Sequence, residues 1–154
     1  MYTVRGVSVA TAATINHAIC QLWNPHSTQR IRVVQYSVFK KAAGAAGDSF
    51  RLKRSTARGT PGSTVTPDID NHSERAIAPV SGALLDLAAF TVQPTLAAAE
   101  LGPDVQPGNS AEAGFTYDIP GGIVIPPGTG LVVAIITGAA FPASGIGFIW
   151  QEDK

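Results

Sequence analysis

The sequence predicts an all-β protein, an antiparallel β-sandwich or jelly roll of about eight strands with at most one short helix. Two observations predict this class. Short runs rich in valine, isoleucine and aromatic residues recur through the last third of the chain, separated by proline and glycine, which is the pattern of strands joined by tight turns. Glycine and proline number 16 and 11 among 154 residues, an excess over average usage that suits many turns.

One domain accounts for the whole chain, residues 1–154. A chain of this length buries roughly 70% of the surface that it exposes when unfolded, which is enough for one core. Eleven basic and eleven acidic residues give a formal net charge of zero, so no overall field attracts polyanions. We therefore expect a single soluble domain that has neither nucleic acid nor a membrane as its partner.

The first 57 residues predict four strands, each bounded by turn-forming residues. In the third strand, alternation places Val34 on one face with Tyr36 and Val38, and Val33 on the other face. The four strands are expected over residues 2–10, 17–25, 30–42 and 49–57.

The rest of the chain predicts one long loop and five strands. Residues 58–79 show no periodic pattern, and ordered loops of this length are usually functional. Residues 94–103 could form one or two helical turns that end at Gly102 and Pro103. The strands are expected over residues 83–94, 115–120, 122–126, 130–137 and 145–151.

The run from Leu131 to Ile136 is apolar without alternation, which predicts a strand buried on both faces. In a sandwich one face meets the core, and the other must be covered by a loop of the same chain or by another subunit. Exposed apolar patches commonly mark interfaces. We therefore place a candidate subunit interface on Val132, Ile136, Phe148 and Trp150.

Motifs of enzymes and cofactor sites are missing from the sequence. The segment from Gly108 to Glu112 lacks the second glycine of a nucleophile elbow, and no phosphate-binding glycine loop occurs. The three histidines lack the spacing of a metal site, and the single cysteine, Cys20, is expected to be buried. The sequence predicts no catalytic residue, no metal site and no cofactor.

Four cations, Arg51, Lys53, Arg54 and Arg58, lie within eight positions of one another. They could contact an acidic protein surface. A solvated strand face would explain them equally well, because Arg51 and Lys53 share one face of the predicted strand.

Four short motifs mark the layout of the whole chain. LWNP closes an early strand, a basic strand runs into RGTP, IPPGTGL joins two strands, and GFIWQ forms the last strand. This layout resembles that of the jelly-roll head decoration, or cement, proteins of tailed bacteriophages. The resemblance implies a non-enzymatic virion structural protein, made in the host cytoplasm, that trimerises on the capsid exterior. There it would bridge neighbouring major capsid proteins and stabilise the head.

Within that role, the expected capsid contacts are Arg54, Arg58, Asp70 and His72. The alternative is a receptor- or glycan-binding module of a phage tail fibre or baseplate. A sugar site combines an exposed aromatic ring with hydrogen-bonding groups. Such groups could come from Trp23 with Asn24, or from Tyr117 with Asp118.

Overall fold

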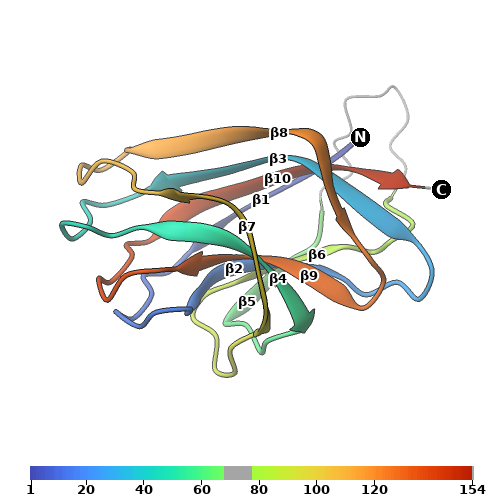
Figure 1. Cartoon of the computed structure of the whole chain (residues 1–154), viewed down its shortest axis with the longest axis horizontal. Helices are drawn as coiled ribbons and strands as arrows, with labels where there is room; N and C mark the ends of the chain where they lie inside the picture. Colours follow the sequence, from blue (N-terminus) through green and yellow to red (C-terminus); the bar gives the residue numbers. More distant parts are fainter. Residues whose placement is uncertain (68–77, 154) are drawn as a thin grey trace.

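Ten β-strands in two antiparallel sheets form the computed structural model of the chain, which describes residues 1–67 and 78–153 (Figure 1). One sheet has the strand order β1-β10-β3-β8 and the other β5-β6-β2-β9-β4-β7. The predicted all-β sandwich is confirmed, with ten strands and with no helix among the described residues. The strands are β1 (Tyr2–Ser8), β2 (Ala18–Asn24), β3 (Arg30–Lys40), β4 (Phe50–Ala57), β5 (Ser63–Val65), β6 (Leu84–Leu87), β7 (Thr95–Val105), β8 (Gly114–Ile125), β9 (Thr129–Ile135) and β10 (Ser144–Asp153).

The expectation of helical turns in residues 94–103 is wrong, because this segment forms β7 along the edge of β4. Its alanines favour a helix, but tertiary pairing overrides this weak preference. The pairing with β4 shifts register at three places. Gly102 and Pro103 are tolerated because an edge strand has a neighbour on one side only.

Several other boundaries differ from the prediction. The strand expected over residues 83–94 is much shorter, because β6 ends at Leu87. Residues 115–120 and 122–126 form one strand, β8, which bends and curves toward the six-stranded sheet (Figure 1). Gly121 and Gly122 have φ angles of 75° and 71° at the bend, values that favour glycine. Within the predicted long loop, β5 pairs with β6, while Asp70 and His72 lie outside the described residues.

A bulge in β3 exchanges the predicted faces of its two valines. The pairing of β3 with β8 passes from Val33 directly to Gln35. One extra residue reverses the alternation of side chains that follows. Val33 therefore joins Tyr36 and Val38 in the core, and Val34 is only partly buried.

Aromatic rings fill the core between the two sheets. Trp150 stacks on Tyr2 with ring centroids 5.8 Å apart, and Phe50 meets Phe141 edge-on at 5.6 Å. Ring pairs of this kind add about 0.5–1.5 kcal/mol beyond the burial of their area. The contacts join β1 to its neighbour in one sheet and β4 to the connection that leads into β10.

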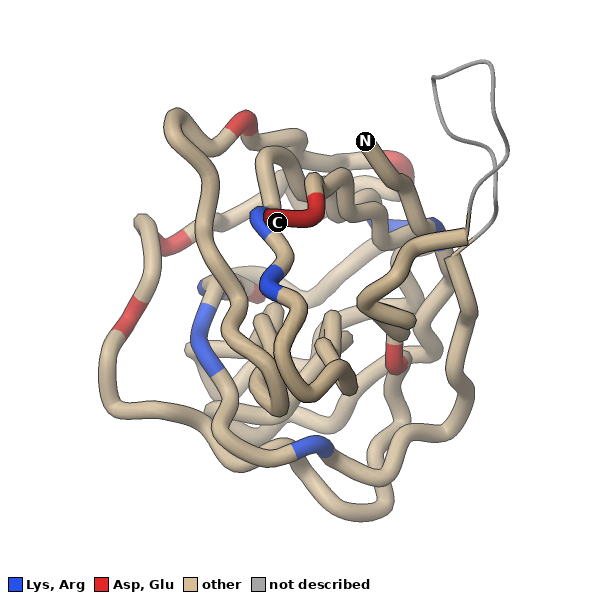
Figure 2. Tube along the Cα trace, turned by 90° about the vertical axis from the view of Figure 1, so that its right-hand side faces the viewer, with Lys and Arg blue, Asp and Glu red and all other residues tan. Residues whose placement is uncertain are grey.

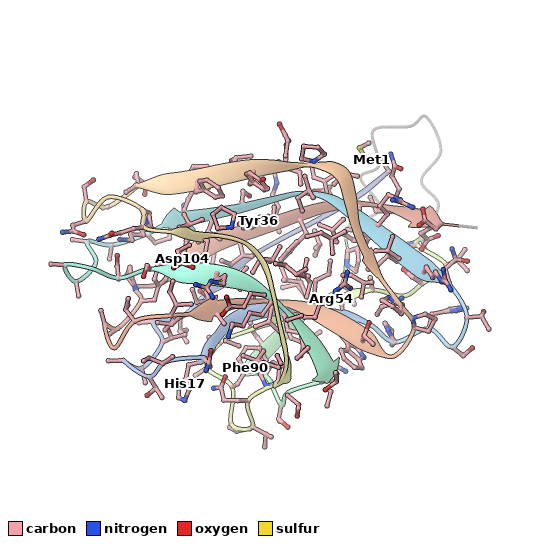
Figure 3. The ribbon with its side chains drawn as sticks, viewed as in Figure 1. Met1, His17, Tyr36, Arg54, Phe90 and Asp104 are labelled. Atoms are coloured by element: carbon pink, nitrogen blue, oxygen red, sulfur yellow. The ribbon has the colours of Figure 1, made fainter. Side chains whose placement is uncertain are left out.

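Strand β9 is buried on both faces, as its apolar sequence predicts. Three of its side chains face the main core: Leu131, Val133 and Ile135. Val132 and Ala134 face outward into a second, smaller cluster, which the segment between β6 and β7 covers with Phe90 (Figure 3). The same chain therefore supplies the cover, so a second subunit is not needed for this face.

The side chains predicted for a subunit interface lie mostly inside the single chain. Val132, Phe148 and Trp150 are 0%, 1% and 0% exposed, and Ile136 is partly buried. The first three expose at most 1% of their surface, which leaves almost nothing for a second subunit to contact. An interface between copies would need other residues.

We expect Phe90→Ala to destabilise the protein by about 3 kcal/mol, because the cavity would lie directly over β9. The free energy of unfolding in urea measures the loss. Val92→Ala is the matched control, since Val92 lies on the same segment but is 59% exposed, and its effect should stay within about 0.5 kcal/mol. Equal stabilities for the two variants would contradict the covering role of Phe90.

Candidate binding surface

The exposed-face cations of β4 are bound to partners within the chain. Arg51 pairs with Glu100 and Asp104 of β7, and its hydrogen bond lowers the pKa of the Asp104 carboxyl. Lys53 Nζ lies 2.9 Å from Asn16 Oδ1 and 3.7 Å from Glu100. Basic and acidic residues are interspersed along the trace rather than gathered on one side (Figure 2). The ion pairs that Arg51 and Lys53 make with Glu100 and Asp104 attach the edge strand β7 to β4.

The two described residues predicted to contact a capsid, Arg54 and Arg58, also have partners in the chain. Arg54 Nη1 donates a 2.6 Å hydrogen bond to the carbonyl of Val124, which ties β4 to β8 in the opposite sheet (Figure 3). Arg58 makes two 2.7 Å bonds to the carboxylate of Asp86. The Asp86 side chain is fully buried and raises the pKa of Arg58 through this hydrogen bonding. Both guanidinium groups therefore support the fold.

The two residue pairs considered for sugar contacts do not form open sites. Asn24, which follows Trp23, is fully buried, and its amide donates to two backbone carbonyls. Tyr117 packs against the core. Asp118 lies on the opposite face of β8, where it accepts a 2.5 Å hydrogen bond from Gln35. Neither pair sets an aromatic ring beside a free polar group.

Residues 1–67 and 78–153 contain no group of three potential ligands arranged to hold a metal ion. Over the same residues, no helix has the length and apolar character required to cross a membrane. His26 instead serves a turn, because its Nδ1 accepts hydrogen bonds from the N–H groups of Thr28 and Gln29 at 3.1 and 2.7 Å.

The outer face of the four-stranded sheet is open and hollowed. A groove of about 590 Å³ lies over it, with Val7 and Phe39, 60% and 39% exposed, as apolar rims. Strand register brings side chains from all four strands into rows beneath this groove. The two rows are Val7, Gly145, Phe39 and Gly114, and then Arg5, Gly147, Ser37 and Thr116.

Gly145 and Gly147 form the floor of the groove. They face outward because Ile146 and Phe148 of the same strand point into the core. Pairing of β10 is regular at both glycines, and neither has a positive φ, so backbone conformation does not require glycine here. A Cβ at Gly145 would make ordinary contact, 3.4 Å from Lys41. Glycine inside a strand weakens it and often marks close approach of a ligand or another chain.

Phe39 is positioned by the neighbouring edge strand. A side chain at Gly114 would collide with the Phe39 ring, so this glycine lets the ring lie against β8. Aromatic rings that cover edge glycines help to fix strand pairing. The exposed part of the ring borders the groove.

The sequence carried a signal for the floor of this groove but not for its walls. In GIGFIW, glycine alternates with large apolar residues, which puts Gly145 and Gly147 on one face. Nothing local shows that β1 and β3 flank β10. Val7 and Phe39, distant in sequence, could not be assigned to one surface.

Comparisons with protein families, with curated proteins and with solved structures returned no match for this chain. The likeness to phage decoration proteins therefore rests on the layout of the sequence alone.

We expect Arg58→Ala to destabilise the protein by about 2 kcal/mol, because Asp86 would lose its ionic partner while buried. Breaking a fully buried pair costs about 3–5 kcal/mol, and the 36% exposure of Arg58 reduces the loss. Urea unfolding measures it. Arg30→Ala, at an exposed position, should leave stability within about 0.5 kcal/mol. An Arg58→Ala protein as stable as wild type would contradict the structural role.

Cys20 should resist thiol reagents in the native protein. Its side chain is fully buried, and desolvation raises its pKa to about 12, so the reactive thiolate is scarce at pH 8. Modification should become rapid in urea, followed as loss of the free thiol. Because this is the single cysteine of the chain, fast labelling without urea would contradict its burial.

Proposed function

We propose that the protein is a non-enzymatic virion structural protein that decorates the outside of a capsid and acts by contacting the major capsid protein. The difference between its two outer faces carries the proposal. Around β9 the six-stranded sheet is covered by its own chain, and ion pairs occupy β4 and β7. The outer face of the four-stranded sheet is open over the groove, with Val7 and Phe39 exposed. Exposed apolar side chains favour contact with another protein.

A homotrimer would make such a contact effective. A stable protein interface buries about 800 Å² on each partner, and one small face alone binds weakly. A closed trimer offers the same face three times, so each further contact forms within one complex. The buried aromatic core also keeps the face rigid, which limits the ordering cost of binding.

Binding to undecorated capsids of the encoding virus tests this proposal. Phe39→Asp should weaken binding by about tenfold or more, because the contact would lose an apolar ring and a charge would have to be removed from water. Val92→Asp is the control, with a 59% exposed residue on the covered side, and should bind like wild type. Light scattering of the free protein should give the mass of a trimer. A monomer that ignores capsids, or normal binding by Phe39→Asp, would refute the proposed contact.

A receptor- or glycan-binding module of a tail fibre or baseplate is the second candidate, favoured by the polar lining of the groove. Sugar sites combine a few directed hydrogen-bonding groups with an apolar surface. Phe39 supplies an exposed ring. The polar groups in the lining are Arg5, Gln35, Ser37, Lys41, Glu112 and Thr116.

A glycan array separates the two candidates. Gly145→Val should obstruct the floor of the groove without backbone strain, since this glycine has no positive φ and its Cβ would make only ordinary contact with Lys41. Wild-type binding to a defined glycan that is lost in Gly145→Val, with unchanged thermal stability, would favour the glycan module. Absence of any wild-type signal would reject it.

A further inference from the structure

A lysine and an aspartate are buried together at the two ends of the connection that leads from β3 in one sheet to β4 in the other. Lys40 is the last residue of β3, and Asp48 lies just before β4. Lys40 Nζ is 2.6 Å from Asp48 Oδ1, and neither side chain has exposed surface. Nζ also donates to the carbonyl of Gly108 at 2.9 Å and lies 5.5 Å from the centroid of the Phe141 ring. The pair is therefore sealed from water.

The surroundings leave one oxygen of this pair without a partner. Asp48 Oδ2 is buried and makes no hydrogen bond to residues 1–67 or 78–153, and an ionised carboxylate in such a place is unfavourable. A side chain at Gly44 would collide with Oδ2 and approach Lys40 Nζ to 2.8 Å. Gly44 is held there by a 2.9 Å bond from its N–H to the carbonyl of Asn109. The backbone thus closes directly over the two side chains.

We propose that Lys40 and Asp48 condense into an amide, an isopeptide crosslink between the two side chains. A bond forms between Lys40 Nζ and Asp48 Cγ, and the bond from Cγ to one carboxylate oxygen breaks. That oxygen leaves as water with two of the three ammonium protons, and the third proton remains on the amide nitrogen. No electrons are transferred and no cofactor takes part.

The geometry favours this condensation. A proton passed from the ammonium to the carboxylate gives a neutral amine and a carboxylic acid, which are the reacting forms. Holding such groups in contact can correspond to an effective concentration of about 10⁵–10⁸ M. The amide product is neutral, so it avoids the cost of keeping a charged ammonium and a charged carboxylate away from water. The amide N–H can still donate to the carbonyl of Gly108. The loss of one carboxylate oxygen as water also removes one buried acceptor from the place where Asp48 Oδ2 lacked a partner.

The mass of the denatured wild-type protein tests the proposal. It should be lower than the mass of the sequence by one water molecule. Trypsin should fail to cleave after Lys40, leaving residues 33–41 covalently joined to residues 42–51. Lys53 is the internal control, because it is part of a surface pair with Glu100 and should be cleaved normally. Lys40→Met should have the full mass of its sequence.

Two outcomes would overturn the crosslink. One is a wild-type protein with the full mass of its sequence. The other is a protein lighter by one water in which trypsin still cleaves after Lys40, since that would be a cyclic imide of an aspartate. Both measurements are independent of capsid or glycan binding, so the crosslink can fail while the proposed function stands.

Discussion

Burial of β9 on both faces is the constraint on which the rest of the sandwich depends. Its inward side chains join the main core, while Val132 and Ala134 need a second cover. The segment after β6 provides that cover with Phe90 and leads into β7, which then pairs with β4. A strand without alternation thus accounts for the arrangement of the outer side of the six-stranded sheet around β9.

Polar side chains complete this arrangement, because they form hydrogen bonds with donors and acceptors that are buried when the sheets pack. Gln21 of β2 donates to Ser55 at 2.7 Å and accepts from the N–H of Gly59 at 3.0 Å. Arg58 and Asp86 join the end of β4 to β6. Because buried polar groups are costly when unpaired, these bonds specify one position for the segment after β4. Charges that looked available for a partner in the sequence are thereby used within the fold.

The outer face of the four-stranded sheet is open over the groove and differs in shape, because two glycines lie at its centre. Gly145 and Gly147 leave a hollow between β1 and β3, and Val7 and Phe39 border it. Two glycines in a regular central strand weaken the sheet without a conformational need. Contact with a partner gives a physical reason for accepting that cost, whether the partner is a protein or a sugar.

The sequence by itself determined the all-β class, the double burial of β9 and the burial of Cys20, because each depends on local composition or alternation. It could not give the faces of Val33 and Val34, which a bulge exchanges, nor the strand formed by residues 95–105, whose alanines favour a helix until β4 offers an edge. Only the tertiary structure decided which cations were paired, what covered Val132, and that Val7 and Phe39 border one groove. The reason is physical: strand order and register bring distant residues together, and neither is encoded in the local pattern of the chain.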